Sequence, residues 1–347
     1  MPRFPQEQLI DFGVRLLVQR GVSREPARYL AETAVATDAF GIHTHGVVLY
    51  AFWDKFIGVR IDPAAEPAVA RQTPATALID GRGGFGQLAL RLARQVAVEK
   101  ARTQGCASVA GVHLSWLAAL GPQILPLAKA GLFAQCWAQH NEHQDCAPWG
   151  GIDPKFSTNP VALAFPTHDL PVLSDFSTSA ISIGKTRELI RAGQTAPENL
   201  YMDRDGRPTP DPRVAKEGGG SIFFMGGERY GYRGYAFSLW AEALAAMAGG
   251  SANNPDAPPE QSFHLTVIDP EAFGAAGHYE AEMKRFIAYL KASRPRPGFD
   301  GVRLPGERAQ AASRDAEARG IAVNDRLVAL LNEVAARNGI EGLPTSS

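Results

Sequence analysis

The sequence contains few cysteines, and they do not form a recognisable scaffold. The three, Cys106, Cys136 and Cys146, are odd in number and include no C-x-x-C pair. Thiols used in this way are typical of a cytosolic protein, whereas small secreted domains carry an even set of paired cysteines. We therefore expect reduced thiols, no disulfide framework and a cytoplasmic location.

Long apolar runs and an excess of charge of one sign are also missing. No run approaches the ~20 apolar residues that span a bilayer, and residues 1–9 are polar and contain prolines, unlike a signal peptide. The 35 Lys and Arg residues balance 36 Asp and Glu residues, giving a net charge of -1. We therefore expect neither a membrane nor a nucleic acid as partner. The 347 residues, 45% of them hydrophobic, suffice for a large core in two domains or in one domain with an insertion.

The hydrophobic spacing predicts helices at both ends of the chain and a mixed middle. Helical periodicity is expected over residues 6–20, 25–38, 47–57, 87–103, 114–130, 234–247, 281–293 and 325–338, with further helices opening at 177–180 and at 304–308. Short runs typical of strands lie at 76–80, 107–112, 132–138, 161–165, 171–176 and 264–268. The pattern indicates an α/β protein.

A glycine-rich stretch, Gly81-Arg82-Gly83-Gly84-Phe85-Gly86, lies between the strand at 76–80 and the helix at 87–103. It matches the G-x-G-x-x-G pattern of dinucleotide-binding proteins in the expected context. However, the next strand, 107–112, ends without the acidic residue that binds a ribose, and no regular βαβ series follows. We favour the alternative that the glycines form a turn in which a helix packs closely on a strand.

Two histidines lie two residues apart in the stretch from Thr37 to Val47. A histidine beside a glycine at the start of an apolar segment can give or take a proton near neutral pH, although histidines with structural hydrogen bonds are common. His43-x-His45 could also present two imidazoles to a metal, with His140 or His143 as further ligands. We find no convincing third ligand set and expect no metal.

Eight stretches, in order, resemble the malate/lactate dehydrogenase family that is distinct from the Rossmann dehydrogenases. The resemblance runs from about residue 6 to 335, and the family includes ureidoglycolate dehydrogenase, 2,3-diketogulonate reductase, sulfolactate dehydrogenase and Δ1-piperideine-2-carboxylate reductase. The matching pieces are D-A-F-G-I-H-T-H-G-V (38–47), D-G-R-G-G-F-G-Q (80–87), A-P-W-G-G (147–151), F-S-T-N-P (156–160), D-F-S-T-S-A (175–180), D-G-R-P-T-P-D-P (205–212), G-Y-R-G-Y (231–235) and L-P-G-E-R (304–308).

The resemblance implies a fold and an assembly. It implies an α/β, α+β-like architecture: a mostly antiparallel, non-Rossmann nicotinamide-binding sheet flanked by helices, with a second domain built from both termini. We expect a helical terminal domain of residues 1–75 with 305–347, and a central nicotinamide-binding and substrate domain of residues 76–304. The resemblance also implies a homodimer.

The resemblance further implies an NAD- or NADP-dependent oxidoreductase in which His45 is the catalytic proton donor and acceptor. Hydride would move between the nicotinamide and a C=O or C=N carbon of a small-molecule substrate. Arg233 stands where the family usually has lysine, and the two cations differ in geometry. The residues expected to contact the cofactor are Asp175, Ser177, Thr178, Ser179, Tyr232, Arg233, Gly306, Glu307 and Arg308.

Two departures from the family pattern indicate a rebuilt substrate pocket. Leu49 takes the place of the arginine that binds the substrate carboxylate, and Trp116 takes the place of a second histidine, which leaves His113 as a possible substitute. The expected pocket residues are Thr44, Leu49, His113, Trp116 and Asn141. An apolar wall favours a cyclic imine, an ester, an amide or a bulky 2-oxo acid over lactate or malate. The alternatives are a catalytically impaired nucleotide-binding relative and a metal-dependent hydrolase using His43 and His45.

Overall fold

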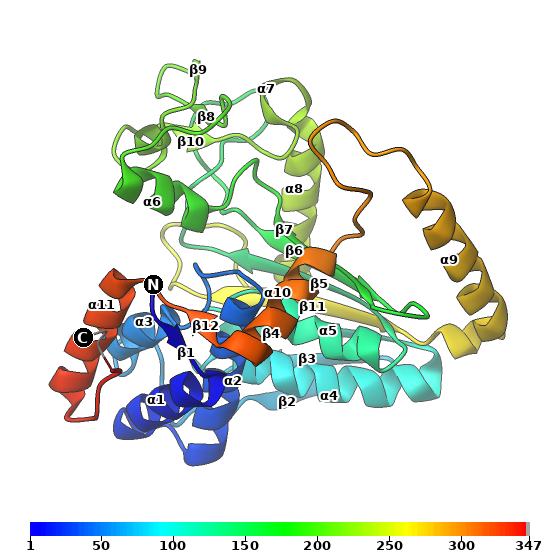
Figure 1. Cartoon of the computed structure of the whole chain (residues 1–347), viewed down its shortest axis with the longest axis horizontal. Helices are drawn as coiled ribbons and strands as arrows, with labels where there is room; N and C mark the ends of the chain where they lie inside the picture. The colour runs from blue at the N-terminus through cyan, green and yellow to red at the C-terminus, as the bar shows by residue number, and fades with distance from the viewer. Residues whose placement is uncertain (345–347) are drawn as a thin grey trace.

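A seven-stranded sheet forms the centre of the molecule (Figure 1). The computed structural model describes residues 1–344. All neighbouring strands are antiparallel except β3 and β4, which are parallel. The predicted mixed α/β fold with a mostly antiparallel sheet is therefore confirmed. In spatial order the strands are β2 (Ala68–Gln72), β3 (Thr76–Asp80), β4 (Cys106–Leu114), β11 (Gln261–Ile268), β5 (Phe133–His140), β6 (Pro160–Phe165) and β7 (Val172–Ser177).

Helices cover both faces of this sheet. Alternate residues of β5 point to opposite faces: Cys136 and Ala138 join the large core under α4 (Gly86–Gln104) and α5 (Gly121–Lys129), whereas Trp137 packs with Ala241 and Leu244 of α8 (Tyr232–Met247). Strand β5, near the middle of the sheet, is thus buried on both faces.

The two ends of the chain share a second core. It is formed by α1 (Gln6–Gln19), α2 (Arg24–Ala39), α3 (Leu49–Phe56), α10 (Glu307–Arg319) and α11 (Asp325–Asn338). Strand β1 (Arg3–Phe4) pairs with β12 (Ile321–Ala322) and ties the N-terminus to the C-terminal segment. Strand β2 pairs with β3 in the central sheet, although it precedes the expected boundary at residue 75.

A third small unit follows β7 and was not expected from the sequence. It contains α6 (Ile183–Ala192), β8 (Tyr201–Met202), β9 (Pro208–Thr209), the 3-10 helix η1 (Pro212–Ala215) and β10 (Ser221–Ile222). Its own core includes Leu189, Tyr201, Ile222 and Phe224. The remaining elements are α7 (Gly227–Tyr230), η2 (Pro270–Phe273) and α9 (Ala276–Lys291), and Figure 1 shows α9 extending away from the body of the molecule.

Two predicted helices begin later than expected. The helix predicted over 114–130 begins only at Gly121, because Ala118 has a positive φ of 61° that a right-handed helix does not allow. The helix predicted from residue 177 begins at Ile183, where Ser182 caps it. Before it, Ala180 donates its N–H to Phe223 O and Ser179 forms a β-bridge with Phe224, so these residues are not helical.

The glycine-rich stretch packs closely on the end of β4. Gly83, with φ 73°, donates its N–H to His113 O at 2.7 Å, and a Cβ at Gly86 would lie 2.5 Å from Ser115 O. The glycines thus let α4 begin against β4, as the second interpretation of this stretch requires.

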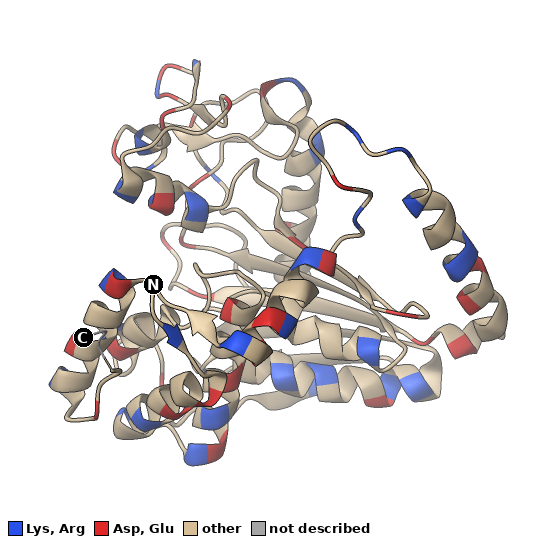
Figure 2. Cartoon of the chain, in the orientation of Figure 1, with Lys and Arg blue, Asp and Glu red and all other residues tan. Residues whose placement is uncertain are grey.

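Most helices carry charged residues of both signs (Figure 2). None of the helices within residues 1–344 has both the length and the apolar composition needed to cross a membrane.

Candidate active site

The buried Asp38 carboxylate organises the loop that carries the two histidines. One of its oxygens accepts the N–H of Val47, and the other lies 2.7 Å from His43 Nδ1. A Cβ at Gly46 would overlap this carboxylate, so glycine is required there. The hydrogen bond that Asp38 accepts from His43 raises the pKa of His43, whose side chain is 60% exposed. His43 therefore has a structural partner and is largely exposed.

Both histidines line a cleft, and the more buried of the two is His45. Its Nδ1 lies 2.7 Å from Thr44 Oγ1, and its backbone N–H bonds to Ile42 O. Burial and then the positive charge of Arg187 lower the pKa of His45. The imidazole is therefore neutral at neutral pH and can act as a base toward a molecule in the cleft.

The cleft has a volume of about 570 Å³ and lies between the terminal helices, the sheet and α6. One wall is apolar, and in it the ring of Phe52 packs edge-on against Trp116 with centroids 4.1 Å apart. The lining includes the expected Thr44, Leu49 and Trp116 together with Val48, Phe52, Gln139, His140, His143, Ser157, Arg187, Leu327 and Leu330. The cleft can thus take a ligand that is partly apolar and partly polar.

Arg187 supplies a positive charge that the sequence interpretation missed. It projects into the cleft from α6. The start of α6 packs closely on the histidine loop: a Cβ at Gly184 would lie only 2.9 Å from Thr44 Cβ. Within residues 1–344 the guanidinium has no ion pair or side-chain hydrogen bond, yet its charge lowers the pKa of both His45 and His143. The sequence signal that could have indicated Arg187 is the helix start at Ser182, since Arg187 lies in the first turns of that helix.

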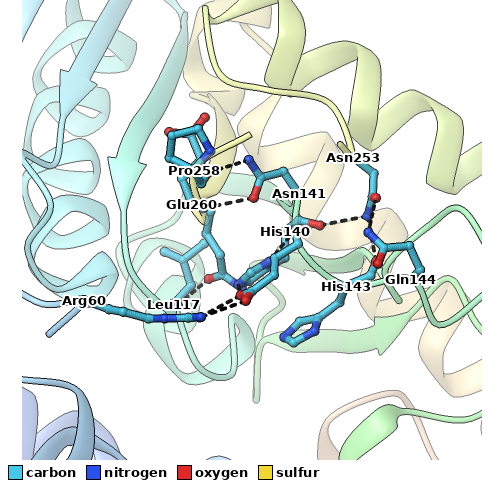
Figure 3. A network of polar contacts seen from close by, with 11 residues as sticks. Arg60, Leu117, His140, Asn141, His143, Gln144, Asn253, Pro258 and Glu260 are labelled. Atoms are coloured by element: carbon cyan, nitrogen blue, oxygen red, sulfur yellow. Dashed lines mark hydrogen bonds and ion pairs between the residues drawn. The ribbon is translucent and has the colours of Figure 1, made fainter. Parts of the chain in front are cut away.

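The turn after β5 brings two further histidines to the cleft (Figure 3). Arg60 binds both carboxylate oxygens of Glu142, at 2.8 and 2.9 Å, and Asn253 Nδ2 donates to the carbonyl oxygens of His140 and His143. These contacts fix the turn, so His140 and His143 are held with rings 4.5 Å apart.

Two expected pocket residues do not line this cleft. Asn141 is buried, and its amide donates to Pro258 O and accepts the N–H of Glu260, so it braces the loop before β11. His113 lines a smaller neighbouring cavity of about 220 Å³, where its Nδ1 lies 3.2 Å from Asp80 Oδ1. Trp116 separates the two spaces, since it lines both.

Comparison with known proteins places the whole chain in one family. The sequence model described as malate/L-lactate dehydrogenase matches residues 4–332.

The chain belongs to the malate/L-lactate dehydrogenase family.

Individual members of the family are similar over nearly their full length. A malate dehydrogenase of Pyrococcus horikoshii is 32% identical, with 98% of this chain and 97% of that protein covered. A Δ1-pyrroline-2-carboxylate/Δ1-piperideine-2-carboxylate reductase of Pseudomonas syringae pv. tomato is 32% identical, with 94% and 95% covered. The solved structure of a putative malate/lactate dehydrogenase from E. coli superimposes with a TM-score of 0.90 at 27% identity, covering 98% and 96%. The chain is therefore a dehydrogenase or reductase of this family.

The three segments expected from the family resemblance to contact the cofactor lie along β7, the edge strand of the sheet. At its start, Leu173 donates its N–H to Pro305 O, next to Gly306 and Glu307 at the beginning of α10. At its end, Thr178 O accepts the N–H of Met225, and the start of α8 packs on the same carbonyl. Five residues of strand span roughly 17 Å, enough to place these segments along an extended ligand.

Some polar groups of these segments have hydrogen-bond partners within the protein, whereas the two arginines have no ion pair in residues 1–344. Thr178 donates to Thr158 O, Ser179 donates to Ile181 O, and Asp175 accepts the N–H of Gly121 at the start of α5. Burial raises the pKa of Asp175 to about 6. Arg233 stacks over Tyr230 and Tyr232, and neither it nor Arg308 has an ion pair in residues 1–344. The cations thus fit a phosphate-bearing cofactor, whereas Asp175 and Thr178 already have structural partners.

Within residues 1–344, one group of side chains could in principle hold a metal ion. It is not the His43-x-His45 pair considered from the sequence. The ligand atoms of His140, Glu142 and His143 lie within 4.8 Å of one another. However, His140 Nδ1 accepts the N–H of Glu142, and Arg60 binds both Glu142 oxygens. Two of the three groups therefore have partners, and the set fits a metal poorly.

Proposed function

We propose that the protein is an NAD- or NADP-dependent oxidoreductase that interconverts a C=O or C=N carbon with its reduced form in a carboxylate-bearing substrate. The observation that carries this proposal is the position of His45: a neutral imidazole facing a cleft with an apolar wall and an unpaired cation. The family membership and the free cations beside β7 support the choice of cofactor.

The residues of the cleft have separate tasks in this reaction. The nicotinamide supplies the hydride in reduction and takes it in oxidation. His45 Nε2 gives a proton to the substrate oxygen or nitrogen in reduction, and accepts it in oxidation. Thr44 fixes the imidazole through Nδ1. Because the pKa of His45 is lowered, the residue is ready to act as a base at neutral pH, and reduction gains as the pH falls toward that pKa.

The lining indicates the class of substrate. Arg187 can bind a carboxylate, a role that the arginine missing at Leu49 would otherwise have. The wall of Leu49, Phe52 and Trp116 can pack against an apolar or aromatic portion. Cyclic imine carboxylates and bulky 2-oxo acids combine both features, whereas pyruvate and oxaloacetate leave the wall uncovered.

We also propose that the protein is a homodimer in which α8 contributes to the interface. One face of α8 packs on β5 and β11, while its other residues include Phe237, Leu239, Trp240 and Met247, all exposed. Several exposed large apolar side chains on one helix favour an interaction site there.

A substrate panel tests the proposed reaction. Reduced nicotinamide cofactor should bind, as followed by its fluorescence, and should be oxidised with phenylpyruvate and cyclic imine carboxylates. Burying a phenyl-sized group is worth roughly 1.5–3 kcal/mol, so kcat/KM should exceed that for pyruvate and oxaloacetate by about tenfold to a hundredfold.

Two other outcomes of this assay have clear meanings. Equal or better use of oxaloacetate would show that the apolar wall does not select the substrate. Cofactor binding without oxidation by any member of the panel would favour a catalytically impaired nucleotide-binding relative. As a positive control, Leu49→Arg should shift preference toward the small 2-oxo acids by adding a cation to the wall.

A further inference from the structure

His140 is the last residue of β5 and lies between the two cavities of the site. It lines both the cleft and the smaller cavity, yet its side chain is only 6% exposed. Its ring lies beside Trp116, with centroids 6.0 Å apart. A histidine in this position reaches a ligand in the cleft while being almost completely enclosed by protein.

The hydrogen bonds of the turn determine which ring nitrogen carries the proton. The backbone N–H of Glu142 donates to His140 Nδ1 at 3.1 Å, so Nδ1 must hold a lone pair. A neutral imidazole has one N–H and one acceptor nitrogen, and the proton is therefore on Nε2. The alternative ring orientation would place a carbon against the Glu142 N–H and lose this bond.

Within residues 1–344 the Nε2–H group has no acceptor. The nearest carboxylate oxygen, Glu142 Oε2, is 3.9 Å away, beyond hydrogen-bonding distance, and is bound by Arg60. Glu260, which lines the smaller cavity, uses its oxygens to accept the N–H groups of His113 and Ser251. Because His140 lines the cleft, a molecule bound there can supply the acceptor that the protein does not.

We propose that His140 contacts the substrate and donates its Nε2–H to the substrate carboxylate. A carboxylate offers only acceptors and therefore complements a nitrogen that can only donate. The inference rests on the proposed function, because it assumes a carboxylate in the cleft. Arg187, also on the cleft, provides the charge that a neutral imidazole lacks.

The surroundings of His140 keep this donor neutral. Burial, followed by the positive charge associated with His143 and with Arg60, lowers the pKa of His140 to about 3, against an opposing effect of Glu142. The Arg60–Glu142 pair is neutral as a whole, so it does not repel an incoming carboxylate. Binding through His140 should therefore not weaken as the pH rises through 6.5.

A binding experiment with the full chain tests this role. The probe is pyrrole-2-carboxylate, a flat ring with a carboxylate and no reducible carbon, titrated into the complex with reduced cofactor. His140→Phe should weaken probe binding about 10- to 100-fold, the value of a hydrogen bond to a charged group, while the Kd of the cofactor stays unchanged. His140→Gln, which keeps an N–H donor, should recover part of the loss.

The matched control is His264→Phe, which replaces another buried histidine of the same sheet. His264 bonds to Ser108 Oγ and does not line the cleft, so probe binding should stay normal. Normal probe binding in a folded His140→Phe variant would overturn the proposal.

The protonation state provides a readout that does not depend on activity. In 15N spectra of histidine-labelled protein, assigned by the signals lost in His140→Phe, Nε2 should be protonated and Nδ1 unprotonated from pH 5.5 to 8. The opposite tautomer would refute the proposal. A wild-type protein that fails to bind reduced cofactor would instead contradict the proposed function, and the tautomer would still be measurable.

Discussion

At the scale of single residues, Asp38 explains why two neighbouring histidines differ. It binds His43 and the N–H of Val47, which turns the loop so that His45 faces the cleft. The two imidazoles therefore have opposite shifts: the pKa of His43 is raised by its carboxylate partner, whereas burial and Arg187 lower the pKa of His45. The H-x-H pattern alone did not distinguish them.

We predict that His45→Gln retains the fold and binds reduced cofactor but loses at least about 10²-fold in turnover, the usual scale for a positioned proton-transfer group. In the wild type, oxidation should decline on acidification, as His45 becomes protonated below its lowered pKa, while reduction should gain. Steady-state kinetics from pH 5 to 9 in both directions check this.

His43→Gln is the matched control, because it changes the neighbouring histidine, which also lines the cleft but is held by Asp38. It should retain most of the turnover. Near-normal turnover in His45→Gln would remove His45 from the mechanism.

At the scale of elements, the glycine turn and α4 show how a motif can be present without its usual ligand. β3, α4 and β4 do form a parallel βαβ unit, as the pattern indicates. However, Gly81 and Gly86 lie against the backbone of residues 113–116, so their missing side chains serve packing. The segments expected to contact the cofactor lie at the other edge of the sheet, along β7.

We predict that changing this turn affects stability and not cofactor binding. Gly86→Ala should destabilise strongly, since its Cβ would meet Ser115 O at 2.5 Å and the backbone must move. Gly83→Ala should cost on the order of 1 kcal/mol, because only its positive φ is strained and the space around it is open. Urea unfolding and cofactor titration measure both effects. A large rise in the cofactor Kd of stable Gly83→Ala would instead point to pyrophosphate binding at the turn.

At the scale of the whole molecule, the cleft is built from parts far apart in the sequence. The histidine loop follows α2, Trp116 follows β4, His140 ends β5, and Arg187 lies on α6 of the third small unit. The exposed apolar residues of α8 lie on an element that contributes no residue to the lining of the cleft.

We predict that the protein is a dimer at micromolar concentration and that Trp240→Lys weakens it. Trp240 is 57% exposed on α8, and a buried interface would have to desolvate the new charge. Size-exclusion chromatography with light scattering measures the mass. Val59→Lys, a charge added at another exposed apolar residue in the turn after α3, should leave the dimer intact. A monomeric wild type, or an unaffected Trp240→Lys dimer, would contradict the interface.

Local patterns were sufficient for much of the fold. Apolar periodicity predicted α1, α4, α8 and α11 closely, since each of these helices buries apolar residues at helical spacing. The bounds of α11 agree with the prediction at both ends. The order of motifs predicted the family and the mostly antiparallel sheet. His45, Thr44, Leu49 and Trp116 were chosen from the sequence, and all four line the cleft.

Tertiary structure decided the rest, because contacts between distant segments leave no local period in the sequence. Only the folded chain places Arg187 near His45 and His143, and only the turn after β5 sets the tautomer of His140. Asn141 was expected in the pocket, but its amide is used by the loop before β11. The sequence by itself determined the elements and the family, whereas packing between the elements decided which polar groups remain free to meet a ligand.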